Sequence, residues 1–483
     1  MSSVIGSESL GTPATPTWWS SAASAVDRRL LVVLTLALAV RIGLAWGTAG
    51  LDLKIVDEQH YRQLAHSLVR GDGFAWEPAN LTSIRPPAYP FFVAGIWTLA
   101  GTESTDAVRV AHIGLSLLTV ILVFRLGRLM FDRRTAVVAA AIVAFYPSLL
   151  FSGVLLLTEV LFTLCLVLTA FGYARLMRAP GPFTAFSTGA ALGLAALTRS
   201  VLWPFVLVLV PLAMLSVRGG RAQRVRTAAL VLLGFMVLVA PWAARNTRLQ
   251  GTFTIVDTMG GLNLHMGNNA HTPEDRMWDA ISLQGTRHWA FEMPATAPGG
   301  AAWTEGTKEK WARATALAYM QTNPLTTLRR SVLKFADFWG LERELVAAFQ
   351  QGLYNPPTWF AVLAVVAVTA SYPAVLLLGV MGACVRPPSD RRTHAFVLLV
   401  IVCICGLHTI VFGHSRYHLP LIPFISLYAA SVATQSVGVW RGWLGNVRQV
   451  ALPVALAVLF VAIWAREILV RDFERITRFL SAS

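Results

Sequence analysis

The sequence predicts an all-helical membrane protein with about eleven transmembrane helices, surface helices in the first external loop and a folded external segment. Of its 483 residues, 55% are hydrophobic and only 13% are charged. The mean hydropathy is +0.59, which is too apolar for a soluble chain of this length. Apolar stretches of about 20 residues recur along the chain, and each is long enough to cross a bilayer as a helix.

The charge balance fits a membrane protein better than a nucleic-acid-binding one. The chain carries 40 Lys and Arg residues against 25 Asp and Glu, a formal net charge of +15. Arginines in cytoplasmic loops account for such an excess, because loops rich in Lys and Arg stay on the cytoplasmic side of the membrane. Arg28 and Arg29 precede the first apolar stretch, so residues 1–26 are expected to form a flexible cytoplasmic tail. We therefore expect lipid partners and no nucleic acid.

Apolar stretches, with arginines at their cytoplasmic ends, give the expected spans in order. Two stretches of transmembrane helices, 27–244 and 356–466, enclose an external segment at 245–355, and residues 467–483 form a C-terminal tail. On this count the tail falls outside although it carries arginines, so its side is left open. The expected spans are 30–48, 106–129, 135–151, 159–177, 185–199, 201–217, 227–244, 357–383, 393–412, 418–436 and 449–465.

The two external regions of this topology are the loop 50–105 and the segment 245–355. The longer segment exceeds the length of a simple connector and is expected to fold as an external cap. Within it, Asn323 and Pro324 are typical of a helix start and Gly340 of a stop. Apolar residues recur there at steps of three and four, which predicts a helix on the membrane surface. These residues are Leu325, Leu328, Val332, Phe335 and Trp339.

Two adjacent acids, Asp57 and Glu58, follow the first span. On a helix from residue 57, Asp57 shares an apolar stripe with Tyr61, whereas Glu58 is expected to form an exposed ion pair with Arg62 four residues on. Asp57 could simply cap the helix. Alternatively, an acid on the apolar stripe of a helix at the membrane edge marks a functional site.

Further candidates lie on the same extracytoplasmic side. Glu159 opens a span, where it either satisfies the helix dipole or faces the first acid across a cleft. Arg199, Arg245 and Arg416 also lie on this side. Such a cluster suits phosphate, because the guanidinium fork forms paired hydrogen bonds, although single arginines also snorkel to lipid headgroups. No histidine or cysteine spacing indicates a metal site or a disulfide framework.

Several segments resemble glycosyltransferase family 39 of the C-type superfamily, which includes protein O-mannosyltransferases and lipid A aminoarabinose transferases. The resemblance covers most of the chain in the right order. It rests on the acid pair of the first loop and on the segments RPPAYP (85–90), LLLTEVLFT (155–163), GLAALTRSVLWPF (193–205), APWAARNTRLQGTF (240–253), GGLNLHMGNN (260–269) and SRYHLPLIPF (415–424).

The resemblance implies an activity and a location. The expected enzyme is an inverting hexosyl- or pentosyltransferase of the C-type fold, taking its sugar from a polyprenyl-phosphate carrier. Its acceptor would be a hydroxyl of a lipid, glycan or protein of the cell envelope. Transfer would occur on the periplasmic or extracellular face of the bacterial inner or plasma membrane. No cofactor is certain, and a divalent metal stays open. The rival interpretation is a polytopic transporter or flippase for lipid or sugar, although matching inverted repeats are not found in the sequence.

The resemblance also implies roles for individual residues. Asp57 would be the catalytic base, Glu159 would hold the second acidic position, and the motifs of Arg199, Arg245 and Arg416 would surround the carrier phosphate. The further expected substrate-binding residues are Glu58, Tyr61, Arg85, Tyr89, Asn246 and Tyr417.

Overall fold

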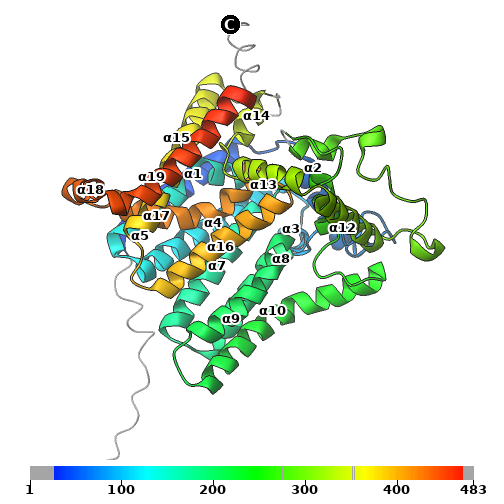
Figure 1. Cartoon of the computed structure of the whole chain (residues 1–483), viewed down its shortest axis with the longest axis horizontal. Coiled ribbons are helices and arrows are strands. Elements are labelled where there is room, and N and C mark those ends of the chain that lie inside the picture. The colour runs from blue at the N-terminus through cyan, green and yellow to red at the C-terminus, as the bar shows by residue number, and fades with distance from the viewer. Residues whose placement is uncertain (1–26, 275–276, 351, 353, 472–483) are drawn as a thin grey trace, which may run out of the picture.

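The computed structural model describes residues 27–274, 277–350, 352 and 354–471. The expected tail 1–26 and most of the C-terminal tail lie outside these residues. The regular structure of the described residues is helical, and their only extended pairing is one bridge between Ala75 and Leu81. Long helices form a bundle, and α12 and α13 lie at one side of it (Figure 1). The predicted all-helical class is confirmed for the described residues.

Seven helices of the described residues are long and apolar enough to cross a membrane. An eighth is reached if Ser415–Ala433 and Val437–Leu444, bent by 101° to each other, form one span. Shorter apolar helices occupy other expected positions, so the count of about eleven stays a prediction. The long helices are α1 (Arg28–Gly47), α4 (Thr105–Met130), α7 (Glu159–Arg178), α10 (Arg221–Gln250), α15 (Thr358–Val385), α16 (Arg391–Ile410) and α19 (Val447–Arg466).

One expected span, 135–151, is divided in the structure. Helix α5 (Arg133–Phe145) ends before Tyr146, and α6 (Pro147–Ser152) starts directly after it. Tyr146 is extended, with φ −65° and ψ 117°, because the ring of a following proline disfavours the helical conformation of the residue before it. The break places Ser148, on α6, beside the cavity described below.

The remaining elements are shorter and lie mostly in the loops and the cap. Among them, α13 starts at Pro324 as expected and ends at Phe338, with Leu325, Leu328 and Val332 exposed. The others are α2 (Val56–Arg70), α3 (Ala88–Ala100), α8 (Pro182–Thr198), η1 (Ser200–Phe205), α9 (Val206–Ser216), α11 (Met259–Gly267), η2 (Met277–Ser282), η3 (Gly285–Arg287), η4 (Pro298–Gly300), α12 (Glu305–Thr322), α14 (Glu344–Gln350), η5 (Ser415–Leu421), α17 (Ile422–Ala433), α18 (Val437–Leu444) and η6 (Glu467–Arg471).

Helices α8 and α10 pack unusually closely, side by side in Figure 1. A Cβ atom on Gly189 would lie 1.8 Å from the Val231 carbonyl oxygen, and one on Gly234 would lie 2.0 Å from that of Phe186. Only glycine allows this approach of two backbones, as at the small-residue interfaces of membrane helices. The contact fixes α8, whose C-terminal cap is Arg199.

Candidate functional site

Asp57 lies in the first turn of α2 and is not its N-cap, which is Ile55. Its Oδ1 accepts a hydrogen bond of 2.7 Å from Arg85 Nη2, and its Oδ2 lies 3.6 Å from Arg416 Nη1. The side chain stays 26% exposed. The structure thus gives Asp57 two arginine partners that the sequence alone did not reveal.

Glu58 corrects the expectation for its neighbour. The predicted exposed ion pair with Arg62 is wrong, because the Glu58 side chain is buried. Its Oε2 accepts hydrogen bonds from the backbone amides of Lys54 and Ile55, and its Oε1 accepts one of 3.0 Å from the amide of Leu156. Glu58 therefore ties the start of α2 to the segment that leads into Glu159.

Glu159 is the first residue of α7, and its side chain is only 2% exposed. Its Oε1 accepts hydrogen bonds from Arg199 Nη2, at 2.6 Å, and from Arg416 Nε. Arg199 is held in turn by a bond of 2.8 Å from its Nε to Thr158 Oγ1. The other carboxylate oxygen, Oε2, is buried and has no hydrogen-bond partner among the described residues.

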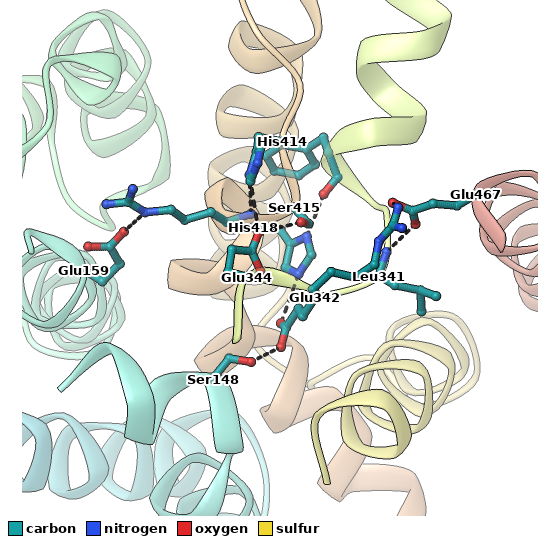
Figure 2. Close-up of polar contacts among 12 residues, drawn as sticks. Ser148, Glu159, Leu341, Glu342, Glu344, His414, Ser415, His418 and Glu467 are labelled. Atoms are coloured by element: carbon teal, nitrogen blue, oxygen red, sulfur yellow. Dashed lines mark hydrogen bonds and ion pairs between the residues drawn. The ribbon is translucent and has the colours of Figure 1, made fainter. Parts of the chain in front are cut away.

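Arg416 joins the two acids. It lies on η5, and its guanidinium contacts both Asp57 and Glu159. Figure 2 shows Glu159 on one side of the segment that carries His414, Ser415 and His418. Three guanidinium groups and two carboxylates, from segments far apart in the sequence, thus meet in one cluster. Each of the three arginine side chains is about one-fifth exposed or less.

Arg85 connects this cluster to a histidine that the sequence did not single out. Its Nη2 lies 2.8 Å from His60 Nδ1, and its Cζ lies 5.7 Å from the centre of the Tyr61 ring. Burial lowers the pKa of His60, and the charge of Arg85 lowers it further. Burial alone would lower the pKa of Arg85, but Tyr61 and Asp57 outweigh it and raise the pKa. The position of His60, three residues after Asp57, was the available signal.

Arg245 and Asn246 lie apart from this network of bonds. Arg245 donates to the carbonyl oxygens of Thr82 and Phe74, and Asn246 Nδ2 donates to that of Val256. None of these bonds reaches Asp57 or Glu159. The structure therefore places Arg245 and Asn246 as supports of the first external loop, whereas the resemblance implied contact with phosphate.

The three expected tyrosines are held by ring contacts. Tyr61 and Tyr89 are buried with ring centres 5.1 Å apart, and the Tyr89 hydroxyl lies 3.3 Å from His112 Nε2. The Tyr417 ring stacks on His408 at 4.0 Å. All three therefore pack around the charged cluster.

A cavity of about 720 Å³ adjoins the cluster. Its walls are mainly apolar and come from α1, α6, α14 and α15. Glu159 and Arg416 line it, and Asp57 does not. Arg416 thus contacts the cavity and Asp57 together. The other polar side chains of the lining include Ser148, Glu342, Glu344 and Ser415.

Sequence reasoning missed three carboxylates of this region, Glu342, Glu344 and Asp257. Glu342 and Glu344 line the cavity but stand in the irregular stretch LERE, where no period marks a face. Asp257 lies between α10 and α11. Burial raises its pKa to about 6 against the lowering effects of Ser200, the Met259 amide and Arg85.

Within the described part of the chain, no three His, Cys, Asp or Glu side chains gather as metal ligands do.

Residues 84–244 match the family described as dolichyl-phosphate-mannose-protein mannosyltransferase. The matched segment includes Arg85, Glu159 and Arg199 and stops short of Arg416. No curated protein matches the sequence significantly.

Solved structures match over most of the chain. The oligosaccharyltransferase AglB from Archaeoglobus fulgidus, in complex with an inhibitory peptide and a dolichol-phosphate, is 13% identical, with a TM-score of 0.51 over 90% of this chain and 54% of that one. Its apo form gives 14% identity and a TM-score of 0.48 over 92% and 55%. ArnT from Cupriavidus metallidurans, bound to undecaprenyl phosphate, gives 15% and 0.40 over 85% and 78%.

The present chain spans about half the length of the archaeal enzyme. At 13% identity this likeness shows a shared fold. The match over residues 84–244 confirms the predicted resemblance to glycosyltransferase family 39 for that segment of the chain.

Proposed function

We propose that this chain is an inverting glycosyltransferase that moves a sugar from a polyprenyl-phosphate carrier to a hydroxyl acceptor on the extracytoplasmic face of the cell membrane. One observation carries the proposal: Arg416 joins two carboxylates and lines a largely apolar cavity. The loop 50–105 would supply the base, and the segment 245–355 would cover the site as a cap.

The cavity suits both parts of the donor, its lipid chain and its phosphate. Its apolar walls can take the part of the lipid next to the phosphate, while the rest of a long polyprenyl chain stays in the bilayer. Arg416 and Arg199 would bind the phosphate, because guanidinium groups form paired, charge-assisted hydrogen bonds with its oxygens. The related fold of AglB, a protein solved with a dolichol-phosphate, supports this assignment.

Asp57 fits the base. Its Oδ1 is engaged by Arg85, whereas its Oδ2 accepts no hydrogen bond from the described residues, and the side chain is 26% exposed. The acceptor hydroxyl would give its proton to Oδ2 as its oxygen bonds to the anomeric carbon. The bond from that carbon to the phosphate oxygen breaks, and the phosphate leaves with the electron pair beside Arg416 and Arg199. Attack opposite the leaving group inverts the anomeric centre.

Glu159 serves this chemistry indirectly in the proposal. Its Oε1 holds Arg199 and Arg416 together, so it orients the two phosphate-binding groups. The acceptor class, whether lipid, glycan or protein, and the hexose or pentose of the donor are left to experiment.

The test is release of the carrier. Reconstituted protein is given a panel of undecaprenyl-phosphate-linked hexoses and pentoses, with membranes of a strain lacking the gene as acceptor, and released undecaprenyl phosphate is measured. Wild-type protein should release it, and Asp57→Asn should lower the rate by about 10²–10⁴-fold. Asp52→Asn is the matched control, because this carboxylate is 85% exposed and pairs with Lys54 at 3.6 Å.

Two outcomes would contradict the proposal. If Asp57→Asn releases undecaprenyl phosphate at the wild-type rate, Asp57 is not the base. Movement of labelled lipid across the liposome membrane with the carrier bond intact would instead identify a transporter.

A further inference from the structure

The segment 341–344 brings two glutamates to the cavity in opposite surroundings (Figure 2). Glu342 is buried, and both of its carboxylate oxygens have hydrogen-bond partners. Its Oε1 accepts a hydrogen bond of 2.8 Å from the Tyr146 hydroxyl and lies 3.1 Å from His418 Nε2. The Ser148 hydroxyl donates to its Oε2. Both oxygens of Glu342 therefore already accept hydrogen bonds, and these bonds anchor the segment.

The histidine that meets Glu342 is equally fixed. His418 Nδ1 lies 2.6 Å from the Phe338 carbonyl oxygen, which can only accept, so Nδ1 carries a proton. The ring stacks on Tyr372 at 4.5 Å and is not exposed. On the other side, the Leu341 amide and the Arg343 side chain donate to Glu467. Both ends of the segment are thus held rigidly.

Glu344 differs from Glu342. Its side chain is 39% exposed, and it lines the cavity. Its Oε1 accepts a hydrogen bond of 2.7 Å from Ser415 Oγ and lies 3.3 Å from His414 Nδ1. Its Oε2 accepts no hydrogen bond from the described residues. Burial alone would raise the pKa of Glu344, but His414 and the Ser415 hydroxyl outweigh it and lower the pKa. The cavity therefore contains an ionised carboxylate with a free acceptor oxygen.

The position of Glu344 relates this oxygen to the donor. Ser415, its partner, directly precedes Arg416 in the chain, and both residues line the cavity. A phosphate on Arg416 would bring the group attached to it into the cavity that Glu344 also lines. In a sugar carried on a polyprenyl phosphate, that group is the sugar ring, which offers hydroxyl donors. An ionised carboxylate accepts such donors strongly.

We propose that Glu344 is a specificity-determining residue that accepts a hydrogen bond from one hydroxyl of the donor sugar. This inference rests on the proposed function and deepens it, because it assigns the selection of the sugar to a cavity residue outside the cluster of Asp57 and Glu159. A site built to accept a hydroxyl hydrogen bond discriminates strongly against an analogue that lacks that hydroxyl.

The experiment couples one variant to donor analogues. The undecaprenyl-phosphate-linked sugar that wild-type protein consumes is compared with its monodeoxy analogues, and kcat/KM is measured from undecaprenyl phosphate release. Glu344→Leu should lower kcat/KM for the parent sugar by about 10- to 100-fold. It should have almost no effect with one deoxy analogue, which lacks the hydroxyl that Glu344 accepts. Glu344→Gln, which keeps an acceptor oxygen, should restore part of the loss.

Glu103→Leu is the matched control. Glu103 is 41% exposed and pairs with a histidine, His66, at 2.6 Å, outside the cavity, so its replacement should leave kcat/KM unchanged. Thermal unfolding checks that each variant is folded. An equal loss by Glu344→Leu with the parent and every deoxy analogue would overturn the inference, and so would an unchanged rate with the parent. Both outcomes leave the proposed function standing, whereas no release from any donor by wild-type protein would overturn the function and the inference together.

Discussion

The start of α2 and the start of α7 each present a carboxylate to Arg416, but the two carboxylates differ in their surroundings. Asp57 is 26% exposed, and its Oδ2 accepts no hydrogen bond within the described part of the chain, whereas Glu159 is 2% exposed and accepts from two arginines through one oxygen. The first arrangement leaves room for an acceptor, and the second holds two guanidinium groups in place. Because each carboxylate keeps one oxygen without a hydrogen bond from the described residues, exposure is the feature on which we propose Asp57 as the base and Glu159 as the orienting acid.

The largest expected difference between the two acids is in stability. Glu159→Gln removes the charge that balances Arg199 and Arg416, and a buried ion pair that loses one partner costs about 3–5 kcal/mol. The melting temperature in detergent should fall strongly, and undecaprenyl phosphate release should fall with it. Asp57→Asn should lower the melting temperature less, because its carboxylate is 26% exposed and water can partly replace the lost ion pairs with Arg85 and Arg416. Equal melting temperatures for both variants would remove the distinction drawn between the two acids.

The residue that both acids share gives the next test. Arg416→Lys keeps a positive charge but loses the planar fork that reaches Asp57 and Glu159 together. We expect kcat/KM for the lipid-linked donor to fall by about 10- to 100-fold, measured by carrier release. Arg441→Lys, at an exposed position of α18, is the control. Full activity of Arg416→Lys would show that the bridge between the acids is dispensable.

Arg245 should behave as a support. Arg245→Met loses the hydrogen bonds to the carbonyl oxygens of Thr82 and Phe74, and unsatisfied buried partners cost about 1–3 kcal/mol. The melting temperature should drop while KM for the donor stays within about twofold, since Arg416 and Arg199 keep the phosphate contacts. A raised KM at unchanged stability would return Arg245 to the phosphate site that the sequence resemblance implied.

Asp257 is a third carboxylate of this region, and it lies near Arg85. Burial raises its pKa from the usual 3.8 to about 6. Between these values the folded protein binds more protons than the unfolded chain, so stability should fall as the pH rises from about 4 to about 6 and level off above. Asp257→Asn should flatten this part of the curve. Thermal unfolding across this range checks the prediction, and parallel curves for both proteins would contradict it.

The sequence predicted the all-helical class because apolar windows of sufficient length dominate a membrane protein, whereas the count of about eleven spans stays a prediction. It missed the break at Tyr146, where the local effect of Pro147 outweighs the apolar pattern. Helical geometry separated Asp57 from Glu58, but the pairing rule then gave Glu58 the wrong partner. The backbone amide of Leu156, 98 residues away, occupies that side chain instead.

The partners of the site were beyond sequence reasoning for the same reason. Arg85 meets Asp57 across 28 residues, and Arg416 meets Glu159 across 257. Charged residues scattered over such separations carry no shared period, so only the packing of α2, α7 and η5 brings them together. Glu344 was invisible for a related reason, since its role depends on the open cavity beside it.

Donor binding and turnover by Asp57→Asn, measured together, test the central claim most directly. Reconstituted variant and wild-type protein are compared for binding of undecaprenyl phosphate and for single-turnover release from the lipid-linked sugar. The account predicts wild-type affinity and a release rate about 10²–10⁴-fold lower, because Arg416 and Arg199 remain while the base is lost. Wild-type release, or a loss of binding as large as the loss of release, would contradict the assignment of Asp57 as the base.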